Sequence, residues 1–251
     1  MTAIEDCRLY LCTPDRPDLV AFVAACIAGG VDVVQLRDKH LEARPLLKRA
    51  ALVRTACADA GVPFILNDRP DLALEAGADG VHVGQDDAPV ALARRILGPD
   101  AIIGLSTHGP ADLAGAMECP GDLSYISAGP VEPTPTKPGR PGTGLGYLTQ
   151  ATGTAAGMPV FVTGGVTPEK IPLLAAAGAR HFVVVRYLTE AADPRQAARA
   201  LRDAIDASDA SDASDAIDDV DKTDEVDEAD EVDEADEADE ADEADEADEA
   251  L

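Results

Sequence analysis

Apolar and polar positions along residues 1–205 form short hydrophobic runs separated by longer, helix-like segments. The eight runs read CRLYLCT, VDVVQLRD, PFILND, GVHVG, IIGLS, YISAG, PVFVTG and HFVVVR. Several of the segments between them end on a glycine, as at Gly61, Gly77 and Gly178, where a left-handed helix cap is favoured. Eight strand–helix repeats predict an α/β fold, the (β/α)8 TIM barrel. An open doubly wound sheet is the alternative, although no G-x-G-x-x-G motif follows the first run.

The composition changes sharply after this region. From Asp206 onward the chain holds 25 acidic residues and one lysine, which gives −24 of the total charge of −28 and leaves −4 for residues 1–205. Repeats of Asp, Glu and Ala with few large apolar side chains cannot bury enough surface to offset chain entropy. We therefore predict a TIM-barrel domain over residues 1–205 and a disordered acidic C-terminal tail over residues 206–251. We interpret the tail as a solubilising extension; the alternative is a nucleic-acid mimic or a docking arm for a basic partner.

The cysteines and the N-terminus indicate a cytoplasmic protein. Five cysteines show neither C-x-x-C pairing nor the spacing of metal ligands, which is typical of reduced, mostly buried thiols. The N-terminal residues show no export signal, and no apolar stretch is long enough to span a membrane. We expect small phosphorylated molecules as partners, with no nucleic acid and no membrane. The sequence leaves a homo-oligomer open.

Polar residues gather where the predicted strands end. In a TIM barrel the active site lies at the C-terminal ends of the strands. There the sequence places residues 35–39, 67–69, 84–87, 106–108, 163–165 and 185–186, whereas the strand starts are comparatively bland. This asymmetry predicts an enzyme.

Cationic residues at these ends indicate a phosphate site. Gln35, Arg37 and Lys39 alternate, so that their side chains point to one side of the strand. Arg offers a bidentate fork and Lys a compact charge, and both suit phosphate oxygens. Lys137 and Arg140 add charge from the proline- and glycine-rich stretch at residues 129–144. The alternative is a solvated loop whose cations form salt bridges to neighbouring aspartates.

Two aspartates at neighbouring strand ends indicate a metal. Asp68 and Asp87 lie beside the predicted phosphate site, and Mg²⁺ binds one or two protein carboxylates together with substrate oxygens. The alternative is that both aspartates only cap the helices that follow. Asp71 and Asp86 look more like caps or surface groups.

Backbone capture of phosphate is predicted after the seventh and eighth strands. Gly164 and Gly165 precede a helix whose first turn holds Pro168, and helix N-termini bind anions. In TIM barrels this site often includes the end of strand eight, here Val185 and Arg186. The chain shows no nucleophile motif such as G-x-S-x-G or H-E-x-x-H. His82, between two valines, is interpreted as a core or helix-facing residue.

Taken together, these residues resemble the thiamine-phosphate synthase family. The matching stretches are VVQLRDKH, FILNDRPDLALEAGADGVHVGQDD, IIGLSTH, GPVEPTPTKPG and VFVTGGVTPEK. Any one of these motifs is shared with other phosphate-binding barrels, but their combination in this order is specific. The flanking elements fit the same layout, so the resemblance covers essentially residues 6–204.

The resemblance implies a transferase of thiamine biosynthesis. Hydroxymethylpyrimidine diphosphate loses pyrophosphate through a dissociative, carbocation-like step, and the nitrogen of thiazole phosphate takes its place, with one Mg²⁺ per subunit. The pyrimidine substrate is then held by Gln35, Leu36, Arg37, Asp38, Lys39, Asn67, Ser106 and Lys137. The thiazole phosphate is held by Thr134, Pro135, Thr136, Gly165, Val185 and Arg186. Catalysis falls to Lys137, Arg37, Lys39 and Ser106, and the Mg²⁺ ligands are Asp68 and Asp87.

One residue departs from the family pattern, and two rival functions stay open. Many members have a serine where this chain has Arg186, which either binds phosphate or turns outward to pair with Glu190. The thiazole tautomerase relatives share the fold, but they do not need the diphosphate-binding residues that are present here. A non-catalytic sensor of phosphorylated ligands, with the tail as its binding arm, is the second rival.

Overall fold

Each of the eight apolar runs forms a β-strand in the structure, a computed structural model. The strands are β1 (Leu9–Thr13), β2 (Val33–Leu36), β3 (Phe64–Asn67), β4 (Gly80–Val83), β5 (Ile102–Thr107), β6 (Tyr125–Ala128), β7 (Val160–Thr163) and β8 (His181–Val184). Every neighbouring pair is parallel, and β8 pairs with β1, which closes the barrel. The predicted TIM barrel is therefore confirmed, and the open sheet is excluded.

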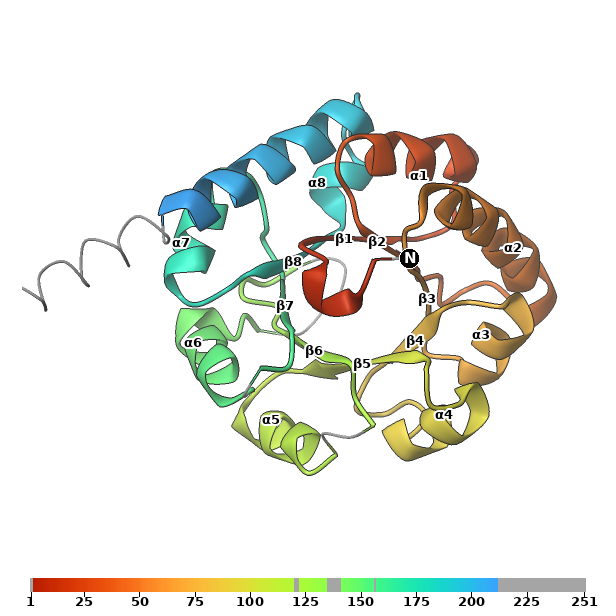
Figure 1. Ribbon diagram of the computed structural model, residues 1–251, viewed down its shortest axis with the longest axis horizontal. Helices are drawn as coiled ribbons and strands as arrows, with labels where there is room; N and C mark the ends of the chain where they lie inside the picture. The colour runs from red at the N-terminus through yellow and green to blue at the C-terminus, as the bar shows by residue number, and fades with distance from the viewer. Residues whose placement is uncertain (1, 120–121, 135–140, 156, 212–251) are drawn as a thin grey trace, which may run out of the picture. The chain divides into compact units, whose positions relative to one another are not determined.

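Helices surround this barrel (Figure 1). They are α1 (Leu19–Ala28), α2 (Ala43–Ala60), α3 (Pro70–Ala76), α4 (Val90–Leu97), α5 (Pro110–Met117), α6 (Gly144–Thr154), α7 (Ile171–Ala176) and α8 (Arg186–Thr189). The predicted caps are confirmed for α2 and α3, because Gly61 and Gly77 have φ values of 69° and 61°. Left-handed backbone is readily adopted by glycine, which lacks a Cβ.

The structure describes residues 2–119, 122–134, 141–155 and 157–211. It divides into two compact units, Met1–Ser208 and Asp209–Leu251. The predicted boundary between residues 205 and 206 lies within a helix that spans residues 194–211. Most of the predicted tail, residues 212–251, lies outside the described residues, so its disorder stays a prediction.

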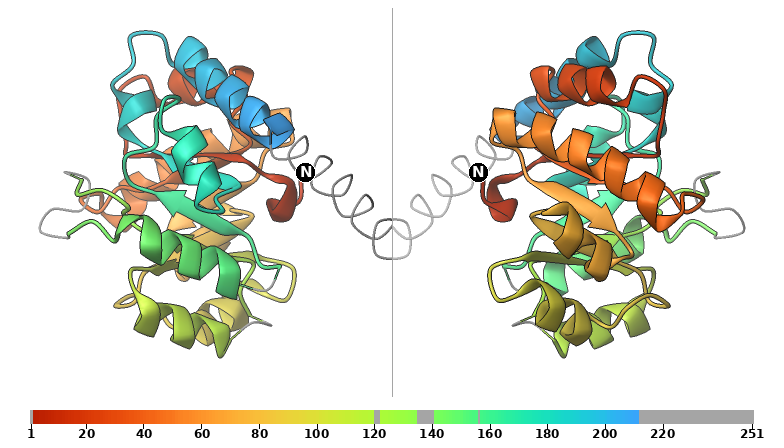
Figure 2. Two further views of the ribbon diagram at one scale, coloured as in Figure 1. Left: turned by 90° about the vertical axis from the view of Figure 1, so that its left-hand side faces the viewer. Right: turned by 90° about the vertical axis from the view of Figure 1, so that its right-hand side faces the viewer.

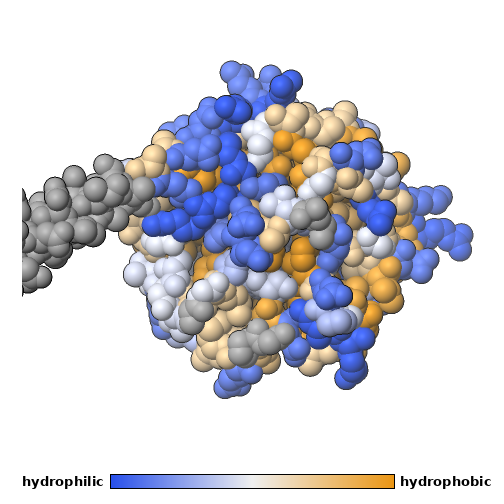
Figure 3. All heavy atoms as spheres, viewed as in Figure 1, coloured by the Kyte–Doolittle hydropathy of each residue, from blue (hydrophilic) through white to orange (hydrophobic). Residues whose placement is uncertain are grey.

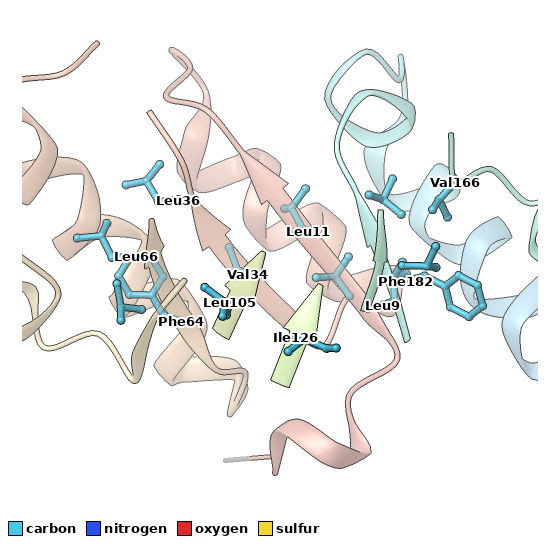
Figure 4. Packing of buried hydrophobic residues seen from close by; sticks show 14 of the residues in the cluster. Leu9, Leu11, Val34, Leu36, Phe64, Leu66, Leu105, Ile126, Val166 and Phe182 are labelled. Carbon is cyan, nitrogen blue, oxygen red and sulfur yellow. The ribbon is translucent and has the colours of Figure 1, made fainter. Parts of the chain in front are cut away.

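The core has two parts, separated by the strands themselves. Alternate strand residues such as Leu9, Leu11, Val34 and Leu36 pack outward against the helices (Figure 4). The intervening residues point into the barrel and form a second cluster, which consists of Ile4, Cys7, Tyr10, Val33, Ile65, Ile102, Tyr125 and Phe161. Burying one large apolar side chain completely contributes about 1.5–3 kcal/mol. Both faces of most strands are thus buried, as expected of a parallel sheet, whereas His181 and Val183 of β8 are half-buried.

The N-terminal end of the barrel is covered and neutralised by local contacts. A short 3-10 helix, η1 (Ile4–Asp6), precedes β1, and Ile4 belongs to the interior cluster. The Asp32 carboxylate accepts hydrogen bonds from the backbone N–H groups of Arg8 and Leu9, at 2.9 and 2.8 Å, and pairs with Arg202. Figure 2 shows this N-terminal segment and the segment that follows β6 at opposite ends of the barrel.

The predicted thiols are confirmed as free. Cys7, Cys12, Cys26 and Cys57 are buried, and Cys119 is exposed. Burial raises the pKa of Cys7, Cys26 and Cys57 to about 12, which keeps these thiols protonated and unreactive.

On the face that Figure 1 views, at one end of the barrel, hydrophilic side chains are interspersed with apolar ones (Figure 3). Among the residues that the structure describes, four large apolar side chains are exposed, and they belong to different helices: Val20, Leu52, Leu74 and Leu173. Within the described ranges, no helix has the length and hydrophobicity that a membrane crossing requires.

Candidate active site

A cavity of about 850 Å³ opens at the C-terminal end of the barrel, and all eight strands or the loops after them contribute to its wall. Most of the predicted site residues line it: Gln35, Arg37, Asp38, Lys39, Asn67, Asp68, Asp87, Ser106, Thr134, Gly165, Val185 and Arg186. Pro135, Thr136 and Lys137 lie outside the described residues, as does Arg140. The C-terminal ends of all eight strands thus meet at one cavity.

Leu36 is the predicted site residue whose side chain lies elsewhere. It is fully buried and belongs to the outer part of the core, between the strands and the helices. Successive side chains of a strand point to opposite faces, so the alternation that aims Gln35 and Arg37 into the barrel aims Leu36 out of it. Its side chain therefore does not face the cavity.

The cationic wall is made by Arg37, Lys39 and Arg186. Lys39 Nζ lies 2.9 Å from Asp68 Oδ2, so the expected alternative of a local salt bridge holds for this residue. Arg186 is exposed, begins α8 and lines the cavity. Among the described residues no ion pair joins it to Glu190. Positive charge at this wall faces the space that substrate would occupy.

Asp38 lines the same wall but has a different task. Its carboxylate accepts hydrogen bonds from the backbone N–H groups of His40 and Leu41, at 2.8 and 3.0 Å, and from that of Asp15 at 3.3 Å. Aspartate side chains commonly hold turns in this way. We infer that Asp38 shapes the loop that presents Lys39, and that its negative charge is already satisfied by backbone donors.

Asp87 lies close enough to Asp68 to affect the ionisation of the Asp68 carboxyl. Burial and the adjacent Asp87 carboxylate raise the pKa of Asp68, and the Lys39 ammonium partly opposes this rise. The Asp87 carboxylate accepts a hydrogen bond from the Gly84 N–H at 2.8 Å, which fixes its position. Asp68 has a φ of 64°, an uncommon value for a residue with a side chain. Two facing carboxylates held in this way leave negative charge that one Lys does not balance.

The helix-cap alternative for these aspartates is wrong. The N-cap residues of α3 and α4 are Arg69 and Pro89, and neither helix start receives a side-chain capping hydrogen bond. Asp71, at the start of α3, is exposed and pairs with Arg69 at 2.6 Å, as expected for a surface group. The described residues contain no cluster of three His, Cys, Asp or Glu side chains that could hold a metal, so a cation here would take its other ligands from substrate and water.

The floor of the cavity is a hydrogen-bonded chain that the sequence did not reveal. Gln35 Nε2 donates to Tyr10 OH at 2.8 Å, and Tyr10 OH lies 2.9 Å from Tyr125 OH. Tyr125 OH lies 2.9 Å from His82 Nδ1, and His82 Nε2 lies 2.9 Å from Ser106 Oγ. All five residues are buried. His82 therefore points into the barrel, so of the two expected positions the core position is confirmed and the helix-facing one is not.

Gly104 makes room for this floor. A Cβ at this position would lie 2.1 Å from Tyr125 Cζ, because the ring crosses directly over the Gly104 backbone. The Tyr125 ring stacks on His82 and packs edge-on against Phe161, with ring centroids 5.5 and 5.1 Å apart. Below the polar floor, the barrel interior is thus filled by aromatic rings.

The glycines after β7 line the opposite wall. Gly165 has a φ of 82°, and a Cβ there would meet Glu132 Oε2 at 2.5 Å. Glu132 in turn accepts two hydrogen bonds from Lys170 Nζ, at 2.5 and 2.6 Å. The left-handed backbone of this position favours glycine, and Gly165 lines the cavity.

A parallel barrel whose strand ends gather cations, paired carboxylates and glycine turns around one cavity defines an enzyme that acts on small phosphorylated molecules. A family model described as thiamine monophosphate synthase matches residues 9–188. The chain belongs to the thiamine-phosphate synthase family.

Individual relatives agree with this assignment. The thiamine-phosphate synthase of Mycobacterium sp. (strain KMS) is 45% identical over 215 residues, which cover 81% of this chain and 94% of that protein. The thiamine-phosphate synthase of Thermobifida fusca is 46% identical over 202 residues, with 79% and 92% covered. Among solved structures, thiamine phosphate pyrophosphorylase from Pyrococcus furiosus superposes with a TM-score of 0.72 at 27% identity, covering 80% of this chain and 96% of that one.

Proposed function

We propose that this chain is a transferase that joins hydroxymethylpyrimidine diphosphate to thiazole phosphate. The C–O bond between the pyrimidine methylene and the diphosphate breaks, and the electron pair leaves with pyrophosphate. The thiazole nitrogen then gives its lone pair to the methylene carbon, and thiamine phosphate forms. The observation that supports this proposal most directly is that the cationic wall, the carboxylates of Asp68 and Asp87, and the glycines after β7 all line one cavity.

The diphosphate is assigned to the cationic wall. Arg37 and Lys39 stand beside each other on the end of β2, and Asn67 follows on β3. Hydrogen bonds from charged groups contribute about 1.5–3 kcal/mol each, and those that strengthen as charge develops on the leaving group speed the reaction. We assign Gln35 and Ser106 to the pyrimidine ring side of the same substrate, and Lys137 to its diphosphate. Asp38 acts behind them by holding the loop.

The carboxylate pair fits Mg²⁺. The raised pKa of Asp68 beside Asp87 reports a site in which a second negative charge is unfavourable without a cation. Carboxylate oxygens are ligands that Mg²⁺ prefers, and Asp68 and Asp87 would hold it. When bound there, Mg²⁺ would supply Lewis-acid neutralisation of the departing pyrophosphate. Lys39 contacts Asp68 and would therefore also lie close to the pyrophosphate oxygens.

Thiazole phosphate is assigned to the wall formed by β6, β7 and β8. Thr134, Gly165, Val185 and Arg186 line this side, and we assign Pro135 and Thr136 to the same substrate. Arg186 adds a charge that favours phosphate. The attacking thiazole nitrogen carries no proton, so the reaction needs no general base. Fixed positive charge in a cavity that excludes water is then the main contribution of the protein.

The proposal is tested by an assay with purified full-length protein, hydroxymethylpyrimidine diphosphate, thiazole phosphate and Mg²⁺. We expect thiamine phosphate and pyrophosphate to appear in equal amounts, and both to be lost when EDTA removes the metal. Arg37→Met should abolish most turnover, whereas Arg95→Met, at an exposed arginine of α4 outside the cavity, should not. Tight binding of thiazole phosphate without product would contradict the proposal and favour the tautomerase or sensor alternative.

A further inference from the structure

The hydrogen-bonded chain on the cavity floor extends one residue beyond Gln35 and has a defined order. Its first member is Cys12, whose Sγ donates to Gln35 Oε1 at 3.3 Å. The chain then runs from Gln35 through Tyr10 and Tyr125 to His82, and it ends at Ser106. It crosses the barrel interior from β1 and β2 to β4, β5 and β6. Both ends, Cys12 and Ser106, line the cavity.

The two tyrosines determine in which direction the hydrogen bonds of this chain run from donor to acceptor. Burial raises the pKa of Tyr10 and Tyr125 far above the ordinary value of a phenol, so each keeps its hydrogen. A buried hydroxyl that keeps its hydrogen needs an acceptor for it, because an unpaired buried donor is costly. Each phenol therefore accepts from one neighbour and donates to the next. A chain of this kind has only two possible directions.

The Gln35 amide selects one of them. Its Oε1 accepts the Cys12 thiol hydrogen, so Nε2 is the atom that faces Tyr10 and donates to it. Tyr10 must then donate to Tyr125. Tyr125 in turn donates to the imidazole Nδ1 of His82, which acts as an acceptor there. The imidazole hydrogen consequently sits on Nε2 and points at Ser106 Oγ.

We propose that His82 is a positioning residue: fixed by Tyr125 with its hydrogen on Nε2, it donates to Ser106 Oγ and turns the Ser106 hydroxyl hydrogen toward the cavity. Ser106 is thereby presented to substrate as a hydrogen-bond donor. Its main chain is held as well, because Gln85 Nε2 donates to the Ser106 carbonyl at 2.7 Å. A donor that is oriented before substrate arrives needs no reorganisation during the reaction.

The consequence for substrate rests on the proposed function. A pyrimidine ring offers nitrogen lone pairs as acceptors, and a serine that donates would fix the ring in the cavity. With the opposite direction of the chain, the Ser106 hydrogen would be spent on His82 Nε2, and the cavity would meet an acceptor instead. The direction therefore decides which edge of the aromatic ring can face Ser106.

The first experiment reads the tautomer and needs no activity. The full chain is labelled with ¹⁵N-histidine, and the couplings between ring nitrogens and ring protons are recorded at neutral pH without substrate. The His82→Gln variant identifies the His82 signals by their loss. We expect the pattern of hydrogen on Nε2. Hydrogen on Nδ1, or an equal mixture of the two forms, would overturn the proposal whether or not the protein proves to be a synthase.

The second experiment asks whether the chain acts through Ser106. Tyr125→Phe keeps the ring over Gly104 but removes the donor to His82. We expect kcat/KM for the pyrimidine diphosphate to fall about tenfold, the value of one hydrogen bond, with KM for thiazole phosphate unchanged. Tyr147→Phe, at a buried tyrosine of α6 that lies outside the cavity, is the matched control and should change neither value.

A double variant separates positioning from general damage to the core. If Tyr125 acts through His82 and Ser106, Tyr125→Phe combined with Ser106→Ala should be no slower than Ser106→Ala alone. Losses that simply multiply in the double variant would show that Tyr125 acts independently, and the proposal would fail. Melting temperatures of all variants confirm that folded protein is compared with folded protein.

Discussion

The two ends of the barrel each carry a pair of aspartates, and the pairs have opposite surroundings. At the N-terminal end, Asp32 accepts two backbone N–H groups and pairs with Arg202, and Asp79 accepts the Phe64 N–H at 2.8 Å. At the C-terminal end, Asp68 and Asp87 face each other, and burial together with this proximity raises the pKa of Asp68. At the N-terminal end, backbone N–H groups and Arg202 hold the carboxylates, whereas the carboxylates at the C-terminal end are left with charge to give to a ligand.

The barrel interior also changes from apolar near its N-terminal end to polar near the cavity. Apolar and aromatic side chains fill the lower barrel, and the polar floor of Gln35, His82 and Ser106 lies above them. These three buried polar residues belong to one hydrogen-bonded chain with Tyr10 and Tyr125, which makes them tolerable in the core. The comparison suggests that an acidic residue marks function in this fold when its neighbours leave its charge unbalanced. Burial or strand position alone does not mark it.

The largest expected effect comes from Asp68→Asn. We expect turnover with Mg²⁺ to fall at least about 100-fold, since even partners behind a metal ligand contribute on the order of 10- to 100-fold. Folding should survive, because Asn tolerates the left-handed backbone of this position and removes a repulsion with Asp87. Steady-state kinetics and a thermal melt without metal check both points.

The matched control for this change is Asp71→Asn, three residues further along the chain in the first turn of α3. Asp71 is exposed and pairs only with Arg69 among the contacts that the structure describes, so turnover should stay at the wild-type value. Equal losses in the two variants would mean that any lost charge near α3 matters, and the contrast between the two ends of the barrel would not hold.

At the other end, Asp32→Asn should show the reverse pattern. Losing the charged acceptor of two backbone N–H groups and the partner of Arg202 should lower the free energy of unfolding by about 1.5–3 kcal/mol. Turnover per folded molecule should not change, because Asp32 lies outside the cavity. Urea denaturation and kinetics on the same preparation measure the two quantities. A loss of turnover without a loss of stability would break the comparison.

The smallest expected effect is a pH dependence of stabilisation by Mg²⁺. Because the pKa of Asp68 is higher in the folded protein than its ordinary value of 3.8, the folded state holds this proton more tightly than the unfolded state does. Without metal, this residue therefore lowers stability as pH rises from 3.8 to the raised pKa. Below that window both states are protonated, and above it the cost is complete.

Mg²⁺ competes with this proton, so the rise in melting temperature on adding Mg²⁺ should grow across the same window and then level off. Melts with and without Mg²⁺ at a series of pH values measure it. In Asp68→Asn the rise should be small and flat with pH. An equally steep dependence in that variant would place the metal on other groups.

The barrel was predictable because eight runs and their glycine caps are local signals. The cavity wall followed, since parallel strands place their C-terminal ends together. Leu36 was predicted as a substrate-binding residue from the family resemblance alone. The alternation that points Gln35 and Arg37 into the barrel already excludes the Leu36 side chain from the cavity. For Lys137, Pro135 and Thr136 the prediction stays a prediction, because these residues lie outside the described residues.

The link across the floor was missed because its middle members, Tyr10, Tyr125 and His82, look like ordinary core residues. His82 lies between Val81 and Val83, and both faces of this strand are buried, so the sequence does not show which face looks into the barrel. Tyr10 and Tyr125 carried the available signal, since a tyrosine inside a buried strand needs a partner for its hydroxyl. Pairing that partner with a histidine on another strand requires knowledge of how the barrel closes.

Gly104 has a consequence for substrate choice. The Tyr125 ring can lie flat across β5 only because position 104 offers no side chain, so the depth of the cavity is set from below by a residue that substrate never meets. Larger residues at this position would lift the ring and raise the floor, while every phosphate-facing group stayed in place. The residue at position 104 therefore sets the depth of the cavity. Substitutions there would change the size of the ring system that fits, while the charged residues that hold the phosphates stay the same.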